Sequence, residues 1–270
     1  MQKLSCPSCS NVAMALASRV QLSVLRCSFC DLVFATEVEG SVNVTAESYY
    51  HDTVANFSWH SLRAERLLSR RLLTYQRFLG RPVQKVLEIG CGSGAFASAF
   101  KALGCTYTGV EFDPRIAAIA REKSAAQIFA GDFLTYRSVD TYDLVFFSQV
   151  LEHVGNPTAF MTKVREVSPG GMVHLDVPNQ DSLASRGRIR FGKHGYGTLY
   201  FPSHMIGYNK KSMLELTSRV GFRQVNIETH ANNHEIWGVP TAATGFTWSV
   251  YYRLCEFTGG GSLLTVLARS

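Results

Sequence analysis

Residues 84–94, Gln-Lys-Val-Leu-Glu-Ile-Gly-Cys-Gly-Ser-Gly, decide the fold of this chain. Positions 86, 87 and 89 are apolar, which is typical of a strand that is buried on both faces of a sheet. Three glycines follow at alternate positions, and residues 95–103 then predict a helix that ends at Gly104. A strand, a glycine turn and a helix in this order predict the nucleotide-binding edge of an open parallel α/β sheet.

Two acidic residues indicate which nucleotide would bind at this edge. The glycine spacing is G-x-G-x-G, which differs from the G-x-G-x-x-G of dinucleotide binders. Glu88 stands two positions before Gly90, where a carboxylate suits a cationic ligand better than a pyrophosphate. Glu111 ends the next apolar run, and a carboxylate there can accept hydrogen bonds from both hydroxyls of a ribose. These features imply a nucleoside with a positive charge and no phosphate, a description that S-adenosylmethionine fits.

Four successive stretches resemble the motifs of class I S-adenosylmethionine-dependent methyltransferases. The similarity covers roughly residues 84–230, and its motifs are residues 87–94, 109–113, 131–133 and 151–154. The resemblance implies a Rossmann-like methyltransferase sheet of seven strands. In such a sheet the last strand, expected at residues 262–268, pairs antiparallel with the sixth, expected at residues 223–228.

The resemblance also assigns the cofactor site. Asp132 would accept a hydrogen bond from the adenine amino group, and Phe133 would pack on the ring or offer its backbone. Gln149 would line the site at the end of the fourth strand. Tyr50 would lie over the cofactor or, alternatively, seat the linker on the domain. The predicted cofactor-binding residues are Tyr50, Glu88, Gly90, Gly92, Gly94, Glu111, Phe112, Asp132, Phe133 and Gln149.

Two histidines are candidate catalytic bases. Methyl transfer to an amine needs little beyond orientation, whereas a hydroxyl or carbon acceptor needs a base, most often histidine. His204 lies in a P-x-H sequence that many similar small-molecule methyltransferases carry, and His153 follows the fourth strand beside the predicted cofactor. A purely structural, hydrogen-bonding role is the alternative for each.

Four cysteines near the N-terminus have the spacing of a metal site. Cys6, Cys9, Cys27 and Cys30 form C-x2-C-x17-C-x2-C, which predicts a zinc ribbon with a closed, structural Zn²⁺ site. Its short strands are expected at residues 20–25 and 32–35. Glycine often follows the second cysteine of such a turn, but Ser10 and Asp31 stand there. The alternatives are unrelated reduced cysteines or a redox pair.

These elements divide the chain into three predicted parts. They are a zinc ribbon at residues 1–40, a linker and N-terminal helix at 41–83, and a class I methyltransferase domain at 84–270. The helix is expected at residues 58–79, and a further helix is possible at 248–257. Residues 180–203 show no clear period and are interpreted as an insertion that builds the acceptor pocket.

Composition is that of a folded globular protein. Of the 270 residues, 46% are hydrophobic and 18% are charged. No apolar run approaches the ~20 residues needed to cross a bilayer, and the N-terminus lacks the apolar core of a signal peptide. We therefore expect a cytoplasmic protein without a membrane partner.

Charge bears on the partners. The net charge is +6 and the pI is near 9.0, which mildly favours anionic partners, but the basic residues are scattered. The layout of a zinc ribbon, a linker with a tyrosine, the methyltransferase sheet and a P-x-H segment resembles bacterial enzymes tied to sugars, polysaccharides and secondary metabolites. This resemblance implies methylation of an oxygen or carbon on such a small molecule. The alternatives are an RNA methyltransferase that uses the ribbon for recognition, and a non-catalytic S-adenosylmethionine-binding protein.

Overall fold

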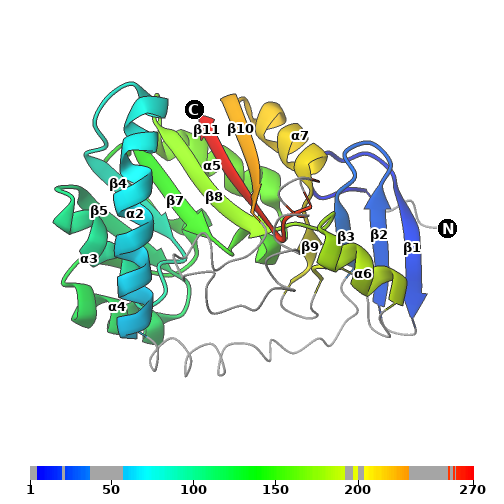
Figure 1. Cartoon of the computed structure of the whole chain (residues 1–270), viewed down its shortest axis with the longest axis horizontal. Helices are drawn as coiled ribbons and strands as arrows, with labels where there is room; N and C mark the ends of the chain where they lie inside the picture. The colour runs from blue at the N-terminus through cyan, green and yellow to red at the C-terminus, as the bar shows by residue number, and fades with distance from the viewer. Residues whose placement is uncertain are drawn as a thin grey trace.

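The centre of the fold is a seven-stranded sheet in the order β10-β11-β8-β7-β4-β5-β6 (Figure 1). The computed structural model describes residues 5–19, 22–36, 57–191, 197–199, 204–230, 255, 258 and 260–270. Only β11 runs antiparallel to its neighbours, and it lies between β10 and β8. The predicted α/β sheet, including its inserted last strand, is confirmed. The strands are β4 (Lys85–Ile89), β5 (Thr106–Glu111), β6 (Gln127–Ala130), β7 (Leu144–Ser148), β8 (Met172–Pro178), β10 (Arg223–His230) and β11 (Leu263–Arg269).

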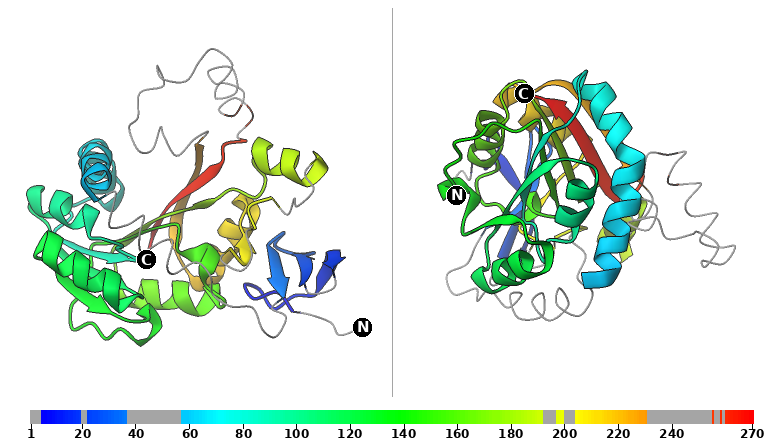
Figure 2. Two further views of the ribbon diagram at one scale, coloured as in Figure 1. Left: turned by 90° about the horizontal axis from the view of Figure 1, so that it is seen from below. Right: turned by 90° about the vertical axis from the view of Figure 1, so that its left-hand side faces the viewer.

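Helices cover both faces of the sheet (Figure 2). Phe146 and Phe147, neighbours on β7, point into opposite cores, and each is fully buried. This explains why the parallel strands are continuous apolar runs. One face carries α2 (Phe57–Leu79), α3 (Ala95–Ala102) and α4 (Pro114–Ser124). The other carries α5 (Pro157–Val167), α7 (Lys210–Val220) and the 3₁₀ turns η1 (Phe133–Thr135) and η2 (Leu151–His153).

The strand order reverses beside β4. This strand pairs with β5 on one side and β7 on the other, with Glu88 opposite Gly109 and Phe146. Ligands of open α/β sheets bind at such a reversal, outside the carboxyl ends of the strands. The glycine turn after β4 and the segment after β7 are therefore neighbours at the predicted binding edge.

A second, smaller sheet contains the N-terminal strands. Its order is β1 (Ala13–Arg19), β2 (Leu22–Cys27), β3 (Val33–Thr36) and β9 (Ile206–Gly207), the last contributed from far along the chain (Figure 1). The two predicted ribbon strands correspond to β2 and β3. Sequence analysis missed β1, because its alanines and leucine favour a helix and only pairing with β2 makes it a strand.

The segment at 180–203 differs from its prediction. It contains α6 (Leu183–Phe191), in which Gly187 and three arginines hide any helical period. The linker at 41–56 with Tyr50, and most of the possible helix at 248–257, lie outside the described residues. Within the described part of the chain, no helix is both long and apolar enough to span a bilayer.

A buried polar network ties α2 to the sheet. The Tyr75 hydroxyl lies 3.0 Å from His174 Nδ1, and His174 Nε2 lies 3.1 Å from Asp176 Oδ2. Thr265 on β11 donates to the other oxygen of Asp176. Burial opposes ionisation of Asp176, but His174 and Thr265 outweigh it and lower the pKa of this carboxyl. The four side chains thus satisfy one another in a dry core.

Removing the Tyr75 hydroxyl should destabilise the fold. Tyr75→Phe keeps the shape but leaves His174 Nδ1 buried without its partner, which costs about 1–3 kcal/mol. Urea unfolding would measure this loss. Ser69→Ala on the exposed side of the same helix is the control and should change the free energy of unfolding by less than about 0.5 kcal/mol. Equal stability of both variants would contradict the role assigned to the network.

Candidate active site

The glycine turn closes tightly around its own backbone. Gly90 has a φ of 70°, and a Cβ atom there would lie 2.6 Å from Val150 Cγ2. Gly94 has a φ of 79° and begins α3, with its position packed against Ala120 and Ser124. Side chains at these positions would both strain the backbone and collide with neighbours. The turn between β4 and the start of α3 therefore requires glycine at both positions.

The Glu111 carboxylate, at the end of β5, is hydrogen-bonded to the glycine turn that follows β4. Its Oε2 accepts from the Gly92 amide at 2.9 Å, and its Oε1 accepts from the Asp113 amide at 3.1 Å. Burial raises the pKa of Glu111, and these backbone amides oppose that effect. Each oxygen keeps a second lone pair, so the carboxylate can also accept from a ligand hydroxyl.

Glu88 is buried at the end of β4. It is 4% exposed and accepts a hydrogen bond from the Tyr107 hydroxyl. Burial raises the pKa of Glu88 to about 8, against the effect of Tyr107 and with help from the charge of Glu111. A cationic ligand nearby would favour its ionised form.

The predicted adenine contacts lie after β5 and β6. Phe112 is 73% exposed, so its ring is available to a ligand. Asp132 accepts from the Leu134 amide at 2.8 Å and caps η1. Phe133 is buried, with its ring centroid 5.0 Å from that of Phe160. The predicted contact of Phe133 with the adenine, through its ring or its backbone, stays a prediction.

Unsatisfied polar atoms gather at the end of β7. Ser148 Oγ, Gln149 Nε2 and both carboxylate oxygens of Glu152 are buried, and none has a hydrogen-bond partner among the described residues. Gln149 also has a φ of 58°. Folded proteins leave few such atoms, so a cluster of them indicates a missing ligand. Glu152 lies in the predicted motif at residues 151–154 but received no role there, because its neighbouring residues do not indicate that its side chain is buried.

The two predicted histidines meet beside Glu152. The rings of His153 on η2 and His204 before β9 have centroids 4.8 Å apart and are nearly perpendicular. His204 Nδ1 lies 3.2 Å from the Thr198 carbonyl, which can only accept, so Nδ1 carries the proton and Nε2 the lone pair. Burial, and the charge of His153, lower the pKa of His204 to about 4. His204 is therefore a neutral imidazole.

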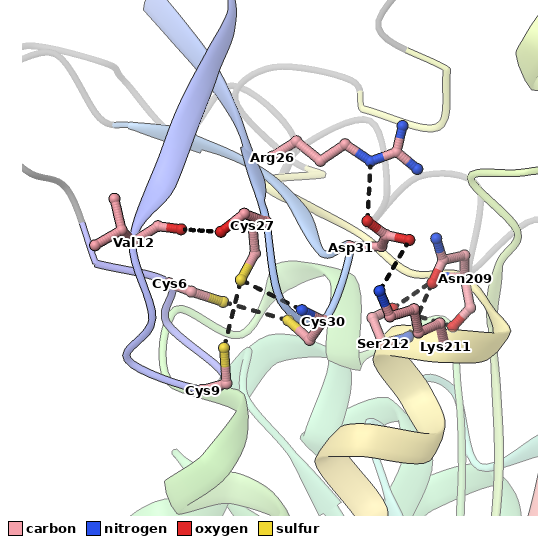
Figure 3. Close-up of polar contacts among 11 residues, drawn as sticks. Cys6, Cys9, Val12, Arg26, Cys27, Cys30, Asp31, Asn209, Lys211 and Ser212 are labelled. Carbon is pink, nitrogen blue, oxygen red and sulfur yellow. Dashed lines mark hydrogen bonds and ion pairs between the residues drawn. The ribbon is translucent and has the colours of Figure 1, made fainter.

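The four cysteines also come together (Figure 3). Their sulfur atoms lie within 4.8 Å of one another, with Cys6 3.6 Å from Cys30 and Cys9 3.4 Å from Cys27. The Cys30 thiol lowers the pKa of Cys6 to about 5, while the same contact raises that of Cys30. Only a cation would let all four ionise together.

Both cysteine turns have the same backbone geometry. The backbone amide of Ser10 donates to the Cys6 carbonyl at 2.9 Å, and the backbone amide of Asp31 donates to the Cys27 carbonyl at 3.1 Å. Ser10 and Asp31 have φ values of 60° and 64°, the conformation that glycine favours. The turns therefore form without glycine, and Asp31 also makes ion pairs with Arg26 and Lys211 (Figure 3).

The N-terminal sheet is joined to the segment that carries His204. The Ala35 amide donates to the Met205 carbonyl at 3.0 Å, and the Met205 amide donates to the Glu152 carbonyl at 3.1 Å. Phe34 pairs with Ile206 in the small sheet. Met205, the residue after His204, thus bridges β3 and the turn that carries Glu152.

A cavity lies beyond the end of β8, between α6 and α7. Its volume is about 320 Å³, enough for part of a small molecule. Three of its side chains are cationic and one is anionic. It is lined by Asn179, Asp181, Leu183, Arg186, Lys210, Lys211, Thr258 and Gly260.

Comparison with known families shows which protein family the chain belongs to. A family model described as a methyltransferase domain matches residues 59–235. The chain belongs to this methyltransferase family. A putative O-methyltransferase from Nostoc punctiforme has the same fold, with a TM-score of 0.58 and 16% identity over 87% of this chain and 64% of that one. An S-adenosylmethionine-dependent methyltransferase from Archaeoglobus fulgidus has a TM-score of 0.53 and 18% identity, over 76% and 94%.

Two curated relatives of the methyltransferase domain are named ubiquinone biosynthesis O-methyltransferases. The one from Rhizobium leguminosarum bv. trifolii is 29% identical over 163 residues, and the match covers 52% of this chain and 64% of the relative. The one from Pseudomonas aeruginosa is 26% identical over 168 residues, covering 54% and 71%. The match to the Rhizobium relative thus spans less than two thirds of its length.

Replacing Glu88 should stabilise the cofactor-free methyltransferase at alkaline pH. Folding raises the pKa of Glu88 from 4.5 to about 8. As the pH rises, the unfolded chain therefore loses this proton before the folded chain does. The free energy of unfolding consequently falls between about pH 4.5 and pH 8. Glu88→Gln cannot ionise, yet it still accepts from Tyr107. We expect a free energy of unfolding about 1–3 kcal/mol higher than wild type at about pH 8, with little difference near pH 4.5.

Urea unfolding at both pH values would test this. Glu215→Gln on the surface of α7 is the matched control and should show no such pH dependence. A Glu88→Gln protein that is less stable than wild type at both pH values would contradict the assignment.

Proposed function

We propose that the protein transfers the methyl group of S-adenosylmethionine to an oxygen of a small-molecule acceptor. The observation that carries the proposal is the cluster of unsatisfied buried atoms at the end of β7. This cluster lies between the glycine turn on one side and the paired histidines on the other. A cofactor at the turn and an acceptor at the histidines would therefore meet over the end of β7.

The cofactor would lie across the carboxyl ends of β4, β5 and β6. In this arrangement the Glu111 carboxylate accepts from the ribose hydroxyls, which its remaining lone pairs allow. Asp132 and the Phe133 backbone would contact the adenine, and the exposed ring of Phe112 would cover it. Glu88 would contribute negative charge near the sulfonium and amino groups of the cofactor. The predicted role of Tyr50 over the cofactor stays a prediction.

The acceptor would lie against Glu152, His153 and His204. The sulfonium methyl is an activated electrophile, so the main task is to align the acceptor atom behind it, which can lower the barrier by about 7–11 kcal/mol. An acceptor hydroxyl must also lose its proton. His204 is the candidate for this base, because its Nδ1 lies against the Thr198 carbonyl and Nε2 is then the ring nitrogen that carries the lone pair.

The acceptor class is supported by two observations. The curated relatives are named as O-methyltransferases, which favours oxygen over carbon. If the acceptor extends from the histidines into the cavity beside the end of β8, the three cationic side chains there favour an acidic or phosphorylated group. We therefore propose a small anionic hydroxyl compound, with carbon methylation as the second candidate.

For the cysteine cluster we propose a structural zinc ion. Four thiolates at about 2.3 Å from Zn²⁺ in a tetrahedron stand about 3.8 Å apart, close to the 3.4 and 3.6 Å of the two sulfur pairs. Cys6, Cys9, Cys27 and Cys30 would hold it and leave no open position. Zinc would thereby fix the ribbon, at predicted residues 1–40, against the segment that carries His204.

The transfer assay uses purified protein and S-adenosylmethionine with a labelled methyl group, offered separately to small-molecule, RNA and protein fractions. We expect label in the small-molecule fraction, and its loss in Glu111→Gln, which weakens the cofactor site. Glu215→Gln is the control and should retain transfer. Label that appears in RNA and is lost after ribonuclease would contradict the small-molecule assignment and make the ribbon a recognition module. Tight cofactor binding without transfer to any fraction would favour a non-catalytic protein.

The zinc assignment predicts a sulfur-coordinated metal in the purified protein. Cobalt-substituted protein should show the intense absorption of cobalt–thiolate bonds. Cys9→Ser should weaken that absorption and lower the melting temperature, because one of four ligands is lost. Cys105→Ser, a buried cysteine outside the cluster, is the control and should retain the absorption. Identical spectra for both variants would contradict a four-cysteine site.

A further inference from the structure

We propose that Gln180 is a positioning residue for His204 and acts on it through Thr198. The Gln180 side chain holds the Thr198 backbone in place, and the Thr198 carbonyl sets which nitrogen of the His204 ring carries the proton. Gln180 lies in the segment that was interpreted from the sequence as part of the acceptor pocket. The inference rests on the base role proposed above for His204, but the tautomer of this ring can be measured without an acceptor.

Gln180 anchors Thr198 through a single oxygen atom. Its side chain is buried, two residues after the end of β8. Its Oε1 accepts from the Thr198 amide at 2.8 Å and from the Thr198 hydroxyl at 2.6 Å. The backbone amide of Gln180 donates to the Tyr208 carbonyl at 2.7 Å, which fixes the backbone from which the side chain extends. Two hydrogen bonds to one buried acceptor therefore determine where the Thr198 backbone lies.

Two glycines leave room for the Gln180 side chain. A Cβ atom at Gly197 would lie 2.5 Å from both Oε1 and Nε2 of Gln180, and one at Gly207 would lie 2.9 Å from Oε1. Gly197 also has a φ of 74°, a conformation that favours glycine. Backbone thus packs directly against the amide group of Gln180 from two segments, which restricts its rotation.

The Thr198 carbonyl is the contact that reaches His204. It lies 3.2 Å from Nδ1 and can only accept, so the proton is on Nδ1. The neutral imidazole of histidine in water favours the other tautomer, with the proton on Nε2, so a fixed acceptor is needed to reverse that preference. Leu199, the next residue, is buried in a cluster with Val24 and Val33 of the N-terminal sheet. The short segment at 197–199 is therefore held by Gln180 on one side and by this sheet on the other.

The tautomer decides whether His204 can act as the proposed base. With the proton on Nδ1, the lone pair is on Nε2, the nitrogen that would take the proton of the acceptor hydroxyl. The acceptor oxygen forms a bond to the methyl carbon as the carbon–sulfur bond breaks, and neutral S-adenosylhomocysteine leaves. The positive charge passes from the sulfonium to the imidazolium, so the step needs no further reactant. Gln180 acts on this step only by setting the tautomer beforehand.

Nitrogen-15 magnetic resonance of the full chain with labelled histidine tests the tautomer directly. A protonated and an unprotonated ring nitrogen have well-separated signals, and His204→Asn identifies those of His204 by their loss. The pKa of His204 is lowered to about 4, so the ring is neutral near pH 7. We expect the Nδ1–H form in wild type, and its share to fall by about half or more in Gln180→Met, which keeps the side-chain length but has no oxygen.

Two further variants separate the role of the oxygen from that of the side-chain shape. Gln180→Glu keeps an oxygen in the same place and should retain the wild-type tautomer. Thr198→Val removes only the hydroxyl contact and keeps the amide contact, so its shift should be intermediate and should cost less stability than Gln180→Met. Gln84→Met, an exposed glutamine just before β4, is the matched control and should leave the His204 signals unchanged.

The same proteins are then assayed for transfer of labelled methyl to the small-molecule fraction. We expect transfer to fall about tenfold or more in Gln180→Met and to be close to wild type in Gln180→Glu. Circular dichroism and S-adenosylhomocysteine binding report whether each variant is folded.

An Nε2–H tautomer in wild type would overturn the inference, as would an unchanged tautomer in both Gln180→Met and Thr198→Val. Equal loss of the Nδ1–H form in Gln180→Met and Gln180→Glu would also overturn it, because the effect would then follow side-chain shape rather than the accepting oxygen. If the tautomer depends on Gln180 but transfer does not fall, the positioning role stands and the base role of His204 fails. If the tautomer does not depend on Gln180 and transfer proceeds, the inference fails and the proposed function stands.

Discussion

The parallel pairing of β4 with β7 is the constraint on which the rest of the site depends. Hydrogen bonding places Glu88 opposite Phe146, so the glycine turn after β4 and the segment after β7 end at the same edge. Because the strand order reverses here, the helices that follow the two strands, α3 and α5, lie on opposite faces of the sheet. The pairing thereby sets which loops meet at the predicted binding edge.

A second, much shorter pairing connects the N-terminal sheet to the segment that carries His204. Only two residue pairs join β3 to β9, yet β9 begins two residues after His204. The Met205 amide, bonded to the Glu152 carbonyl, continues the connection to η2. The cysteine cluster therefore lies in the same hydrophobic core as Leu151 and Tyr208. The N-terminal sheet is therefore packed and hydrogen-bonded against the segment that carries His204.

The site accumulates groups that work against stability. Burial raises the pKa of Glu88 and of Glu152 to about 8, and several polar atoms near Glu152 have no partner in the described part of the chain. The carboxylate of Asp176 is equally buried, but it has hydrogen-bond partners in His174 and Thr265. A buried polar group without a hydrogen-bond partner destabilises the folded state, whereas one in a complete hydrogen-bond network does not. The unsatisfied groups are therefore where ligands are expected to bind.

The sequence by itself determined the features that depend on neighbouring residues: the glycine turn after a buried strand, the acidic strand ends, the paired cysteine turns and the strand order of the large sheet. Backbone preference and apolar periodicity encode these locally. The tertiary structure alone decided that β1 is a strand, that α6 forms and that β9 completes the ribbon sheet. It also decided that Glu152 is buried beside His153 and His204, which lie 51 positions apart along the chain. Such contacts depend on the path of the whole chain and on the hydration that each polar side chain loses when it is buried. Neither of these can be predicted from neighbouring residues alone.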